Sequence, residues 1–294
     1  MNIVYMNGGL GNQMFQYIFF RWLEINSGEK CVIDNAPFYL DNVPHNGYEL
    51  DRIFNLKPPM ISDYFDKDVW QYIIDNRKSK MGGIVQQLAN NGLPIVLVVE
   101  KGAINVEFDG PVIVVNEAKD VPFKFANNHI YYHGYWITTS PLNSIRRTIE
   151  REFIFPKIVD ELNKKYADLI EKSINPVAIH IRRGDMAKLG WSCQPEHFRK
   201  GIFFSENNWR PDKYFLFSDD LDWCNKMSNE LGLDTINHKL IIVNGNNGEN
   251  AYRDMQLMTM CHHRISDHSS FSLMAAMLCQ YPNKEEFFNW KTQV

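Results

Sequence analysis

The segment at 175–185 reads NPVAIHIRRGD and carries the strongest structural signal in this chain. Its apolar run after Pro176 predicts a buried strand of a parallel sheet. Arg182 and Arg183 stand at the carboxyl end of that strand, beside a glycine that permits a sharp turn. Ligands of open α/β sheets bind at this end of the strands, and the planar guanidinium fork matches phosphate oxygens. The segment therefore favours an anion site over the alternative that both arginines are solvated or paired with carboxylates.

Short apolar runs alternate with helical stretches on both sides of this segment. Strands are expected at 2–6, 31–34, 94–99, 111–115, 130–136, 177–181, 214–217, 240–243 and 264–266. Helices are expected at 12–23, 63–91, 144–153, 160–171, 222–231, 251–260 and 272–279. Such alternation implies parallel sheets covered by helices on both faces. We therefore expect an α/β protein of two Rossmann-like domains facing a cleft, at 1–155 and 156–294.

Composition narrows the class of protein. The 294 residues are 45% hydrophobic and 22% charged, with a net charge of -4, which is typical of a globular protein and argues against a broadly basic nucleic-acid surface. The five cysteines lack metal-type spacing, so reduced thiols are expected instead of a disulfide framework or a zinc site. Neither a membrane-spanning stretch nor a signal peptide is recognised, so the expected location is the cytoplasm.

A glycine-rich turn, GGLGNQ at 8–13, lies between the first expected strand and helix. Glycines let the backbone approach a ligand, and a helix N-terminus offers free amides to an anion. Gly9 and Gly11 also begin a dinucleotide fingerprint, with Asp34 at a suitable distance for a ribose contact. Met14 replaces the third glycine of that fingerprint, however, which weighs against an NAD-type dehydrogenase.

Acidic residues follow the expected strand at 214–217. Asp220 and Asp222 match a D-x-D pair that could hold a divalent metal with substrate phosphates. Acids at the start of a helix also cap its free amides and suit its dipole. We favour capping for this pair, because the two arginines already supply a counter-charge for phosphate, and we place Asp219 toward the cleft.

Two serines, Ser269 and Ser270, follow the last expected strand of the second half and open a helix. Their hydroxyls and the backbone amides of the helix N-terminus are suited to binding phosphate. Simple N-capping by one of the serines is the alternative interpretation, and the two roles are compatible.

Taken together, these motifs resemble a known family. The stretch GGLGNQMFQY at 8–17 is similar to the opening signature of bacterial α-1,2-fucosyltransferases of glycosyltransferase family 11. HIRRGD at 180–185 resembles the H-x-R-R-x-D motif that this family shares with α-1,6- and protein O-fucosyltransferases. Further similar landmarks are 48–51, 133–136, 218–220 and 254–272. The chain departs from the family at His268, where Asn is usual, and at 273–276, where Trp-Trp-Gly-Ala is usual.

The resemblance implies a GT-B architecture and an inverting transfer of L-fucose from GDP-β-L-fucose to the 2-hydroxyl of a terminal galactose. The domain at 1–155 would hold the glycan acceptor, and the domain at 156–294 would hold GDP-fucose. Neither a cofactor nor a metal is implied, and nucleic acid is not an expected partner. Contact with the inner face of the membrane is expected only through a lipid-linked acceptor.

The resemblance also implies roles for individual residues. Arg182 would clamp the diphosphate, Asp254 would accept hydrogen bonds from guanine, and His180 would lie against the nucleoside. The other implied donor-side residues are Gly9, Gly11, Asn12, Gln13, Arg183, Ser218, Asp219, Ser269, Ser270 and Phe271. The implied acceptor-side residues are Glu49, Asp51, Tyr135 and Trp136. The general base stays open among Glu49, Asp51 and His133, with Asp185 near the site and placed to orient an arginine.

One rival class besides the dehydrogenase is a non-catalytic glycan-binding protein. Such a module could use Tyr135, Trp136 and Trp191 as flat platforms against sugar rings. It would have no use for a pair of arginines at a strand end together with a serine turn, so we favour the enzyme.

Overall fold

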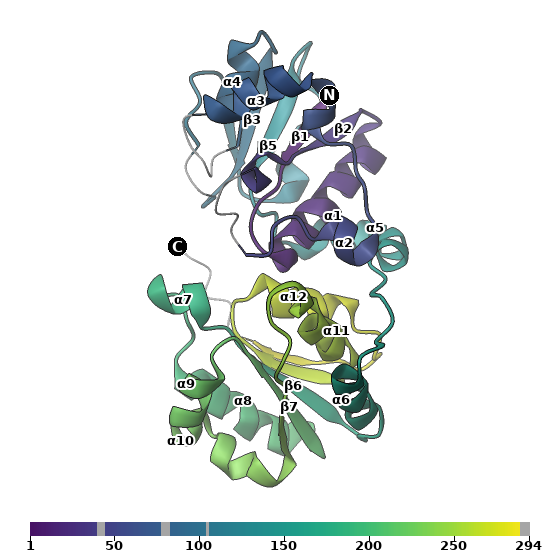
Figure 1. Ribbon diagram of the computed structural model, residues 1–294, viewed down its shortest axis with the longest axis vertical. Coiled ribbons are helices and arrows are strands. Elements are labelled where there is room, and N and C mark those ends of the chain that lie inside the picture. The colour runs from purple at the N-terminus through teal and green to yellow at the C-terminus, as the bar shows by residue number, and fades with distance from the viewer. Residues whose placement is uncertain (40–44, 78–82, 104–105, 289–294) are drawn as a thin grey trace. The chain divides into compact units, whose positions relative to one another are not determined.

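The computed structural model describes residues 1–39, 45–77, 83–103 and 106–288, with the side chain of Asp185 also outside the description. The backbone divides into two compact units, Met1–Phe155 and Pro156–Val294. Each unit is built on one five-stranded sheet in which every paired strand is parallel (Figure 1). The prediction of an α/β fold with two parallel sheets is confirmed.

The N-terminal unit has the strand order β2-β1-β5-β3-β4. Its strands are β1 (Asn2–Tyr5), β2 (Cys31–Asp34), β3 (Ile95–Glu100), β4 (Val112–Val115) and β5 (His129–His133). Its helices are α1 (Leu10–Ser27), α2 (Leu50–Phe54), α3 (Lys67–Asp75), α4 (Val85–Asn90) and α5 (Thr139–Glu152). Alternate residues of a strand point to opposite faces of the sheet, and helices cover both faces. Tyr131 packs among Ile73 and Leu88 of α3 and α4, whereas Tyr132 meets Phe19 of α1 edge to face.

The C-terminal unit has the strand order β10-β9-β6-β7-β8. Its strands are β6 (Pro176–Ile181), β7 (Lys213–Ser218), β8 (Leu240–Ile242), β9 (His263–Ser266) and β10 (Glu286–Phe288). Its helices are α6 (Glu161–Glu171), α7 (Gly184–Lys188), α8 (Pro195–Asn208), α9 (Leu221–Lys226), α10 (Ser228–Leu231), α11 (Tyr252–Met260) and α12 (Ser270–Leu278). All six residues of β6 are buried, as expected of the central strand of a sheet covered on both faces.

Several elements differ from the sequence-based expectation. The helix expected over 63–91 consists of α3 and α4 as separate short helices, with 78–82 outside the described residues. The helix expected over 222–231 breaks between α9 and α10. The strand expected over 130–136 ends at His133, and the backbone of Trp136 lies in the left-handed region with φ 54°. Helix α8 and strand β10 were not expected at all.

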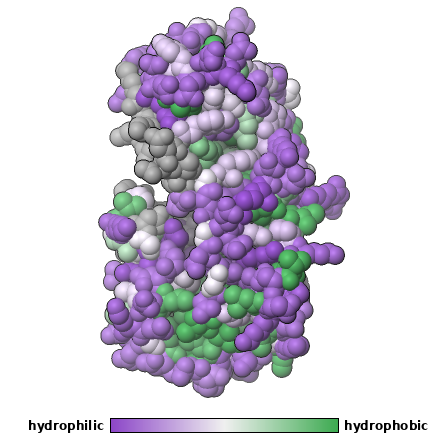
Figure 2. Space-filling model, viewed as in Figure 1, coloured by the Kyte–Doolittle hydropathy of each residue, from purple (hydrophilic) through white to green (hydrophobic). Residues whose placement is uncertain are grey.

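The cysteines, the helices and the molecular surface bear on the expectations from composition. All five cysteines are free and buried. No helix among the described residues has the length and apolar character needed to cross a bilayer. Figure 2 shows a mostly hydrophilic face, on which hydrophobic residues gather mainly over the C-terminal unit.

Candidate functional site

Three strand ends of the C-terminal unit carry the polar residues of the candidate site. Strand β6 lies between β9 and β7, with Ile181 opposite Ser218 and His180 opposite Ser266. The strands run parallel, so the residues that follow them, Arg182, Asp219 and Asp267, emerge at one edge of the sheet. This edge is where open α/β sheets bind ligands.

The two arginines leave the strand in different directions. Arg182 makes an ion pair with Asp219, with 2.8 Å between Nη1 and Oδ2, and 29% of each side chain remains exposed. The guanidinium of Arg183 instead lies over the indole ring of Trp223, 3.9 Å from its centroid. Asp219 also accepts a hydrogen bond from the backbone N–H of Arg183 at 2.7 Å. The carboxylate of Asp219 therefore orients Arg182 without burying it, and Arg183 is held against an aromatic side chain.

Asp267 belongs to this cluster although the sequence analysis did not select it. Its carboxylate is buried and accepts hydrogen bonds from the backbone N–H groups of Arg182 at 2.5 Å and Ser269 at 3.2 Å. Its Oδ1 lies 3.6 Å from Nδ1 of His180. An acid directly after a strand that neighbours the arginine strand was the available signal, but the pairing of β9 with β6 was needed to interpret it.

His180 and the serine turn complete the edge. The buried ring of His180 stacks on Phe271 with 5.8 Å between centroids and 27° between planes. Ser269 caps α12, because its Oγ accepts a hydrogen bond from the backbone N–H of Phe271 at 3.3 Å. The capping alternative is thus realised for Ser269, while Ser270 is half-buried in the first turn of α12. A guanidinium and a helix N-terminus at one strand edge can together stabilise negative charge.

The acidic turn after β7 is occupied by structural contacts. Asp220 caps α9, with its Oδ1 accepting the backbone N–H of Trp223 at 3.0 Å, as predicted. Ser218 donates to the carbonyl oxygen of Ile181 at 2.8 Å and accepts the backbone N–H of Asp220 at 3.1 Å. Ser218 therefore ties the ends of β6 and β7 together, and its hydroxyl is already engaged on both sides.

Asp254 lies in the first turn of α11. Its Oδ1 accepts a hydrogen bond from Nδ2 of Asn246 at 2.8 Å. Burial raises the pKa of the Asp254 carboxyl to about 6, and the Asn246 amide and the nearby His180 act in the opposite direction. A carboxylate in this setting is mainly ionised at neutral pH and titrates just below it.

The glycine turn of the N-terminal unit is held in place by the side chain of Gln13. The side chain of Gln13 is fully buried, and its Nε2 donates to the carbonyl oxygens of Gly8 and Gly47, both at 2.8 Å. Its Oε1 accepts the backbone N–H of Glu49 at 2.9 Å. Gln13 was predicted to contact the donor, but its amide is used to fix this turn.

The anion expected at the N-terminus of α1 is supplied by the protein itself. Gly9 precedes the helix, and the backbone amide of Leu10 hydrogen-bonds the carboxylate of Glu49. Glu49 is buried, also pairs with Arg52 at 2.7 Å, and has its pKa raised by burial. One of the amides at this helix start therefore already has a partner inside the protein, and the donor-binding role of Gly9 and Gly11 stays a prediction.

Asn12 and Asp51 are more exposed to solvent than Gln13 and Glu49. Asn12 is half-buried and packs so closely on Gly8 that a Cβ at that glycine would lie 2.6 Å from its Nδ2. Gly8 has a φ of 85°, so the turn requires glycine there on both grounds. Asp51 lies in the first turn of α2 and makes a loose ion pair with Lys57 at 3.6 Å.

The segment after β5 is mostly core. Trp136 is 1% exposed and stacks on Phe19 with 4.0 Å between centroids and 7° between planes. The expectation of Trp136 as an acceptor-side platform is therefore wrong, because the faces of its indole are taken up inside the protein. His133 is equally buried, with its ring 4.2 Å from that of Tyr5. Tyr135 is half-buried and, with Trp136, donates its backbone N–H to Glu100.

Asp34 does not serve the dinucleotide interpretation either. It is fully buried and accepts hydrogen bonds from the hydroxyl of Tyr131 and from the backbone N–H groups of Ala36 at 2.9 Å and Ile84 at 3.1 Å. A carboxylate saturated in this way has no reach to a ribose, so the dehydrogenase alternative loses its acidic residue.

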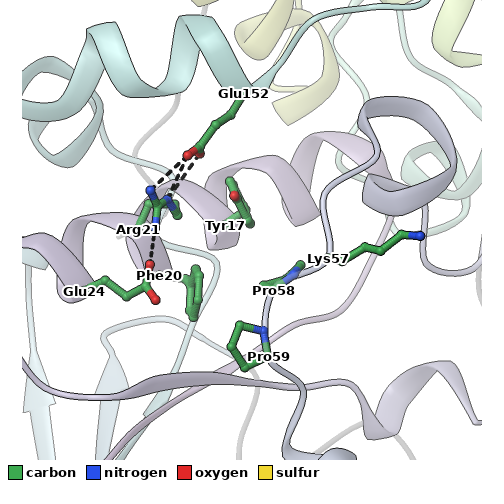
Figure 3. Close-up of a pocket in the computed structure, with 8 residues that line it drawn as sticks. All are labelled: Tyr17, Phe20, Arg21, Glu24, Lys57, Pro58, Pro59 and Glu152. Carbon is green, nitrogen blue, oxygen red and sulfur yellow. Dashed lines mark hydrogen bonds and ion pairs between the residues drawn. The ribbon is translucent and has the colours of Figure 1, made fainter.

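A separate pocket of about 280 Å³ lies beside α1 in the N-terminal unit. Figure 3 shows Arg21 between Glu24 and Glu152, with Pro58 and Pro59 on the other side. Arg21 pairs with both acids, at 3.0 Å in the case of Glu152. The charges of Arg21, Glu24 and Glu152 therefore neutralise one another within this pocket.

Comparisons with known proteins bear on the family and the fold of this chain. Residues 114–282 match the family described as glycosyl transferase family 11. The chain is 25% identical to an α-1,2-colitosyltransferase of Escherichia coli, over 93% of this chain and 86% of that protein. It is 24% identical to the O-antigen biosynthesis glycosyltransferase WbnK of Escherichia coli, over 95% and 90%. The solved structure of the α-1,6-fucosyltransferase NodZ, soaked with GDP-fucose, aligns over 94% of this chain and 91% of that chain, with a TM-score of 0.50 and 16% identity.

Proposed function

This chain belongs to glycosyl transferase family 11 and is a glycosyltransferase of GT-B fold, and we propose that it transfers L-fucose from GDP-β-L-fucose, with inversion, to the 2-hydroxyl of a terminal galactose on a glycan. In this proposal the C-terminal unit binds GDP-fucose and the N-terminal unit binds the acceptor. The relative named for O-antigen biosynthesis supports a bacterial surface polysaccharide, built on an O-antigen or capsule unit, as the acceptor class.

The observation that carries the proposal is the orientation of Arg182 just after the carboxyl end of β6. When the bond between C1 of fucose and the β-phosphate oxygen breaks, GDP departs with the electron pair and negative charge grows on that phosphate. A guanidinium held by Asp219 at 2.8 Å is fixed before the reaction begins. Preorganised donors aimed at developing charge lower the barrier more than they tighten substrate binding.

The acceptor oxygen attacks C1 on the face opposite to departing GDP, which inverts the configuration. Among the candidate bases, Glu49 and His133 are buried, and Asp51 is the exposed one. We propose that a strong base is not required, because an oxocarbenium-like sugar reacts with a positioned hydroxyl and the proton can pass to water as the new bond forms. Asp51 is then the first residue to test as a proton acceptor on the acceptor side.

The proposal also includes independence from metal ions. Asp220, the residue best placed for a D-x-D metal pair, uses its carboxylate to cap α9. The counter-charge for the diphosphate would come from Arg182 and from the N-terminus of α12.

Transfer of colitose is the second candidate, because one relative is named as an α-1,2-colitosyltransferase. Colitose is fucose without its 3-hydroxyl, so the two donors make the same demands on a diphosphate and guanine site. Purified protein should be offered GDP-fucose, GDP-colitose and UDP-galactose in parallel with lactose as a galactose-terminated acceptor. We expect the GDP sugars alone to react and NMR to show a new 1→2 linkage. Preference for GDP-colitose would show that colitose, and not fucose, is the transferred sugar. Preference for UDP-galactose would refute the proposal.

A further inference from the structure

Two buried asparagines of the C-terminal unit, Asn163 and Asn246, form a hydrogen-bond network with Asp254. Asn246, in the loop between β8 and α11, donates from Nδ2 to Oδ1 of Asp254 at 2.8 Å and to Oδ1 of Asn163 at 2.8 Å. Asn163, on α6, donates back from Nδ2 to Oδ1 of Asn246 at 2.9 Å. Asn163 and Asn246 are only 3% and 8% exposed, so water competes poorly for these bonds.

The pair is anchored at a helix cap. Asp160 caps α6 by accepting the backbone N–H of Asn163 at 2.8 Å, and the same oxygen accepts Nδ2 of Asn163 at 2.9 Å. Both hydrogens of the Asn246 amide are thereby assigned, one to Asn163 and one to Asp254. A flipped Asn246 would face its oxygen toward a carboxylate, so the network permits one orientation.

The network acts on the charge and direction of Asp254. Burial favours the neutral acid, and the Asn246 hydrogen bond favours the carboxylate. An ionised carboxylate only accepts hydrogen bonds, which suits the N1–H and amino donors of guanine, whereas the neutral acid presents a donor of its own. The Asn246 bond uses one acceptor position on Oδ1, and among the described residues Oδ2 of Asp254 has no hydrogen-bond partner.

We propose that Asn163 and Asn246 are positioning residues for base recognition, which hold Asp254 ionised and aimed at guanine and so set the pH range in which the protein binds its nucleotide sugar. This inference rests on the proposed function. Among the described residues, His180 of β6 is the charged neighbour that acts on Asp254. Asp160, at the start of α6, binds Asn163, and Arg253 bonds the carbonyl oxygens at 156 and 157. Helix α12, which also packs on α11, carries no titratable side chain.

The test is calorimetric binding of GDP-fucose between pH 5 and pH 8.5 to the wild type, Asn246→Ala and Asn163→Ala. GDP-fucose is the probe because its diphosphate has no terminal phosphate that would titrate near pH 6. Wild-type affinity should fall about ten-fold per pH unit below its midpoint. In Asn246→Ala the midpoint should move up, so that affinity at pH 6 is about ten-fold weaker than wild type but within a few-fold at pH 8.5. Asn163→Ala should move it in the same direction by less.

The controls separate this role from a general structural one. Asn2→Ala removes an equally buried asparagine that bonds Ser27 in the other unit, and it should leave the profile unchanged. Asn246→Asp keeps the size of the side chain if the alanine variant does not fold, and it should raise the midpoint further. Equal weakening at every pH would overturn the inference. A wild type that prefers UDP-galactose to GDP-fucose would instead overturn the proposed function.

Discussion

Replacing each of the two arginines that follow β6 by lysine gives the sharpest test of the reaction chemistry. Arg182→Lys keeps the positive charge but loses the planar fork, so one ammonium cannot both hold Asp219 and offer two parallel hydrogens to the diphosphate. Arg183→Lys mainly loses the stacking of its guanidinium on Trp223, at 3.9 Å from the ring centroid.

The two contacts differ in magnitude. Loss of one preorganised donor to a developing anion costs about 10²–10³ in kcat, or about 2.7–4 kcal/mol. Loss of a partly exposed cation–π contact costs about 0.5–1 kcal/mol, which corresponds to about two- to five-fold. We therefore expect Arg182→Lys to reduce kcat at least about twenty-fold more than Arg183→Lys does.

The assay is single-turnover fucosyl transfer to lactose, with GDP-fucose affinity and Tm measured on the same preparations. In Arg182→Lys, the affinity for GDP-fucose should change much less than kcat, because the additional negative charge on the β-phosphate develops only in the transition state. The opposite order of the two variants would assign the clamp to Arg183. Nearly normal turnover in both variants would refute the mechanism.

Three further outcomes follow from the structure. Asp254→Ala should weaken GDP binding by about ten-fold or more, from about 1.5–3 kcal/mol for a hydrogen bond to a charged group, and unchanged affinity in a GDP titration would remove it from the site. Transfer should persist in excess EDTA, whereas loss that Mn²⁺ restores would show that Asp220 and Asp222 bind a metal. Trp136→Ala should lower the free energy of unfolding by about 3–5 kcal/mol in urea, because the ring stacks on Phe19 in the core. A stable Trp136→Ala variant with weakened galactoside binding would restore the platform interpretation.

Local patterns were sufficient to predict much of the fold. Strand β6 was predicted because a proline, an apolar run and a polar end occur within a single short segment. The Asp220 cap was likewise predicted from its position just before a helix. Helix α8 was missed because its pattern is obscured: Phe198 is fully buried while Phe203, five residues later, is 73% exposed.

The site depended more on contacts between distant segments. Asp267 joins Arg182 only because β9 pairs with β6, and no short-range pattern specifies that pairing. Trp136 was assigned to a ligand face because an aromatic after a strand fits either a platform or a core. Its true environment is fixed by Phe19 of α1, more than a hundred residues earlier in the chain. Sequence therefore indicated the kind of chemistry, and tertiary contacts decided which side chains could take part.

At the start of α1, the carboxyl group of Glu49 accepts a hydrogen bond from the backbone N–H of Leu10. A nucleotide phosphate entering there would have to displace the buried carboxyl group of Glu49, which also pairs with Arg52. Under the proposed function, we therefore expect phosphate to bind beside Arg182, and we expect an uncharged ligand such as a sugar hydroxyl at the start of α1.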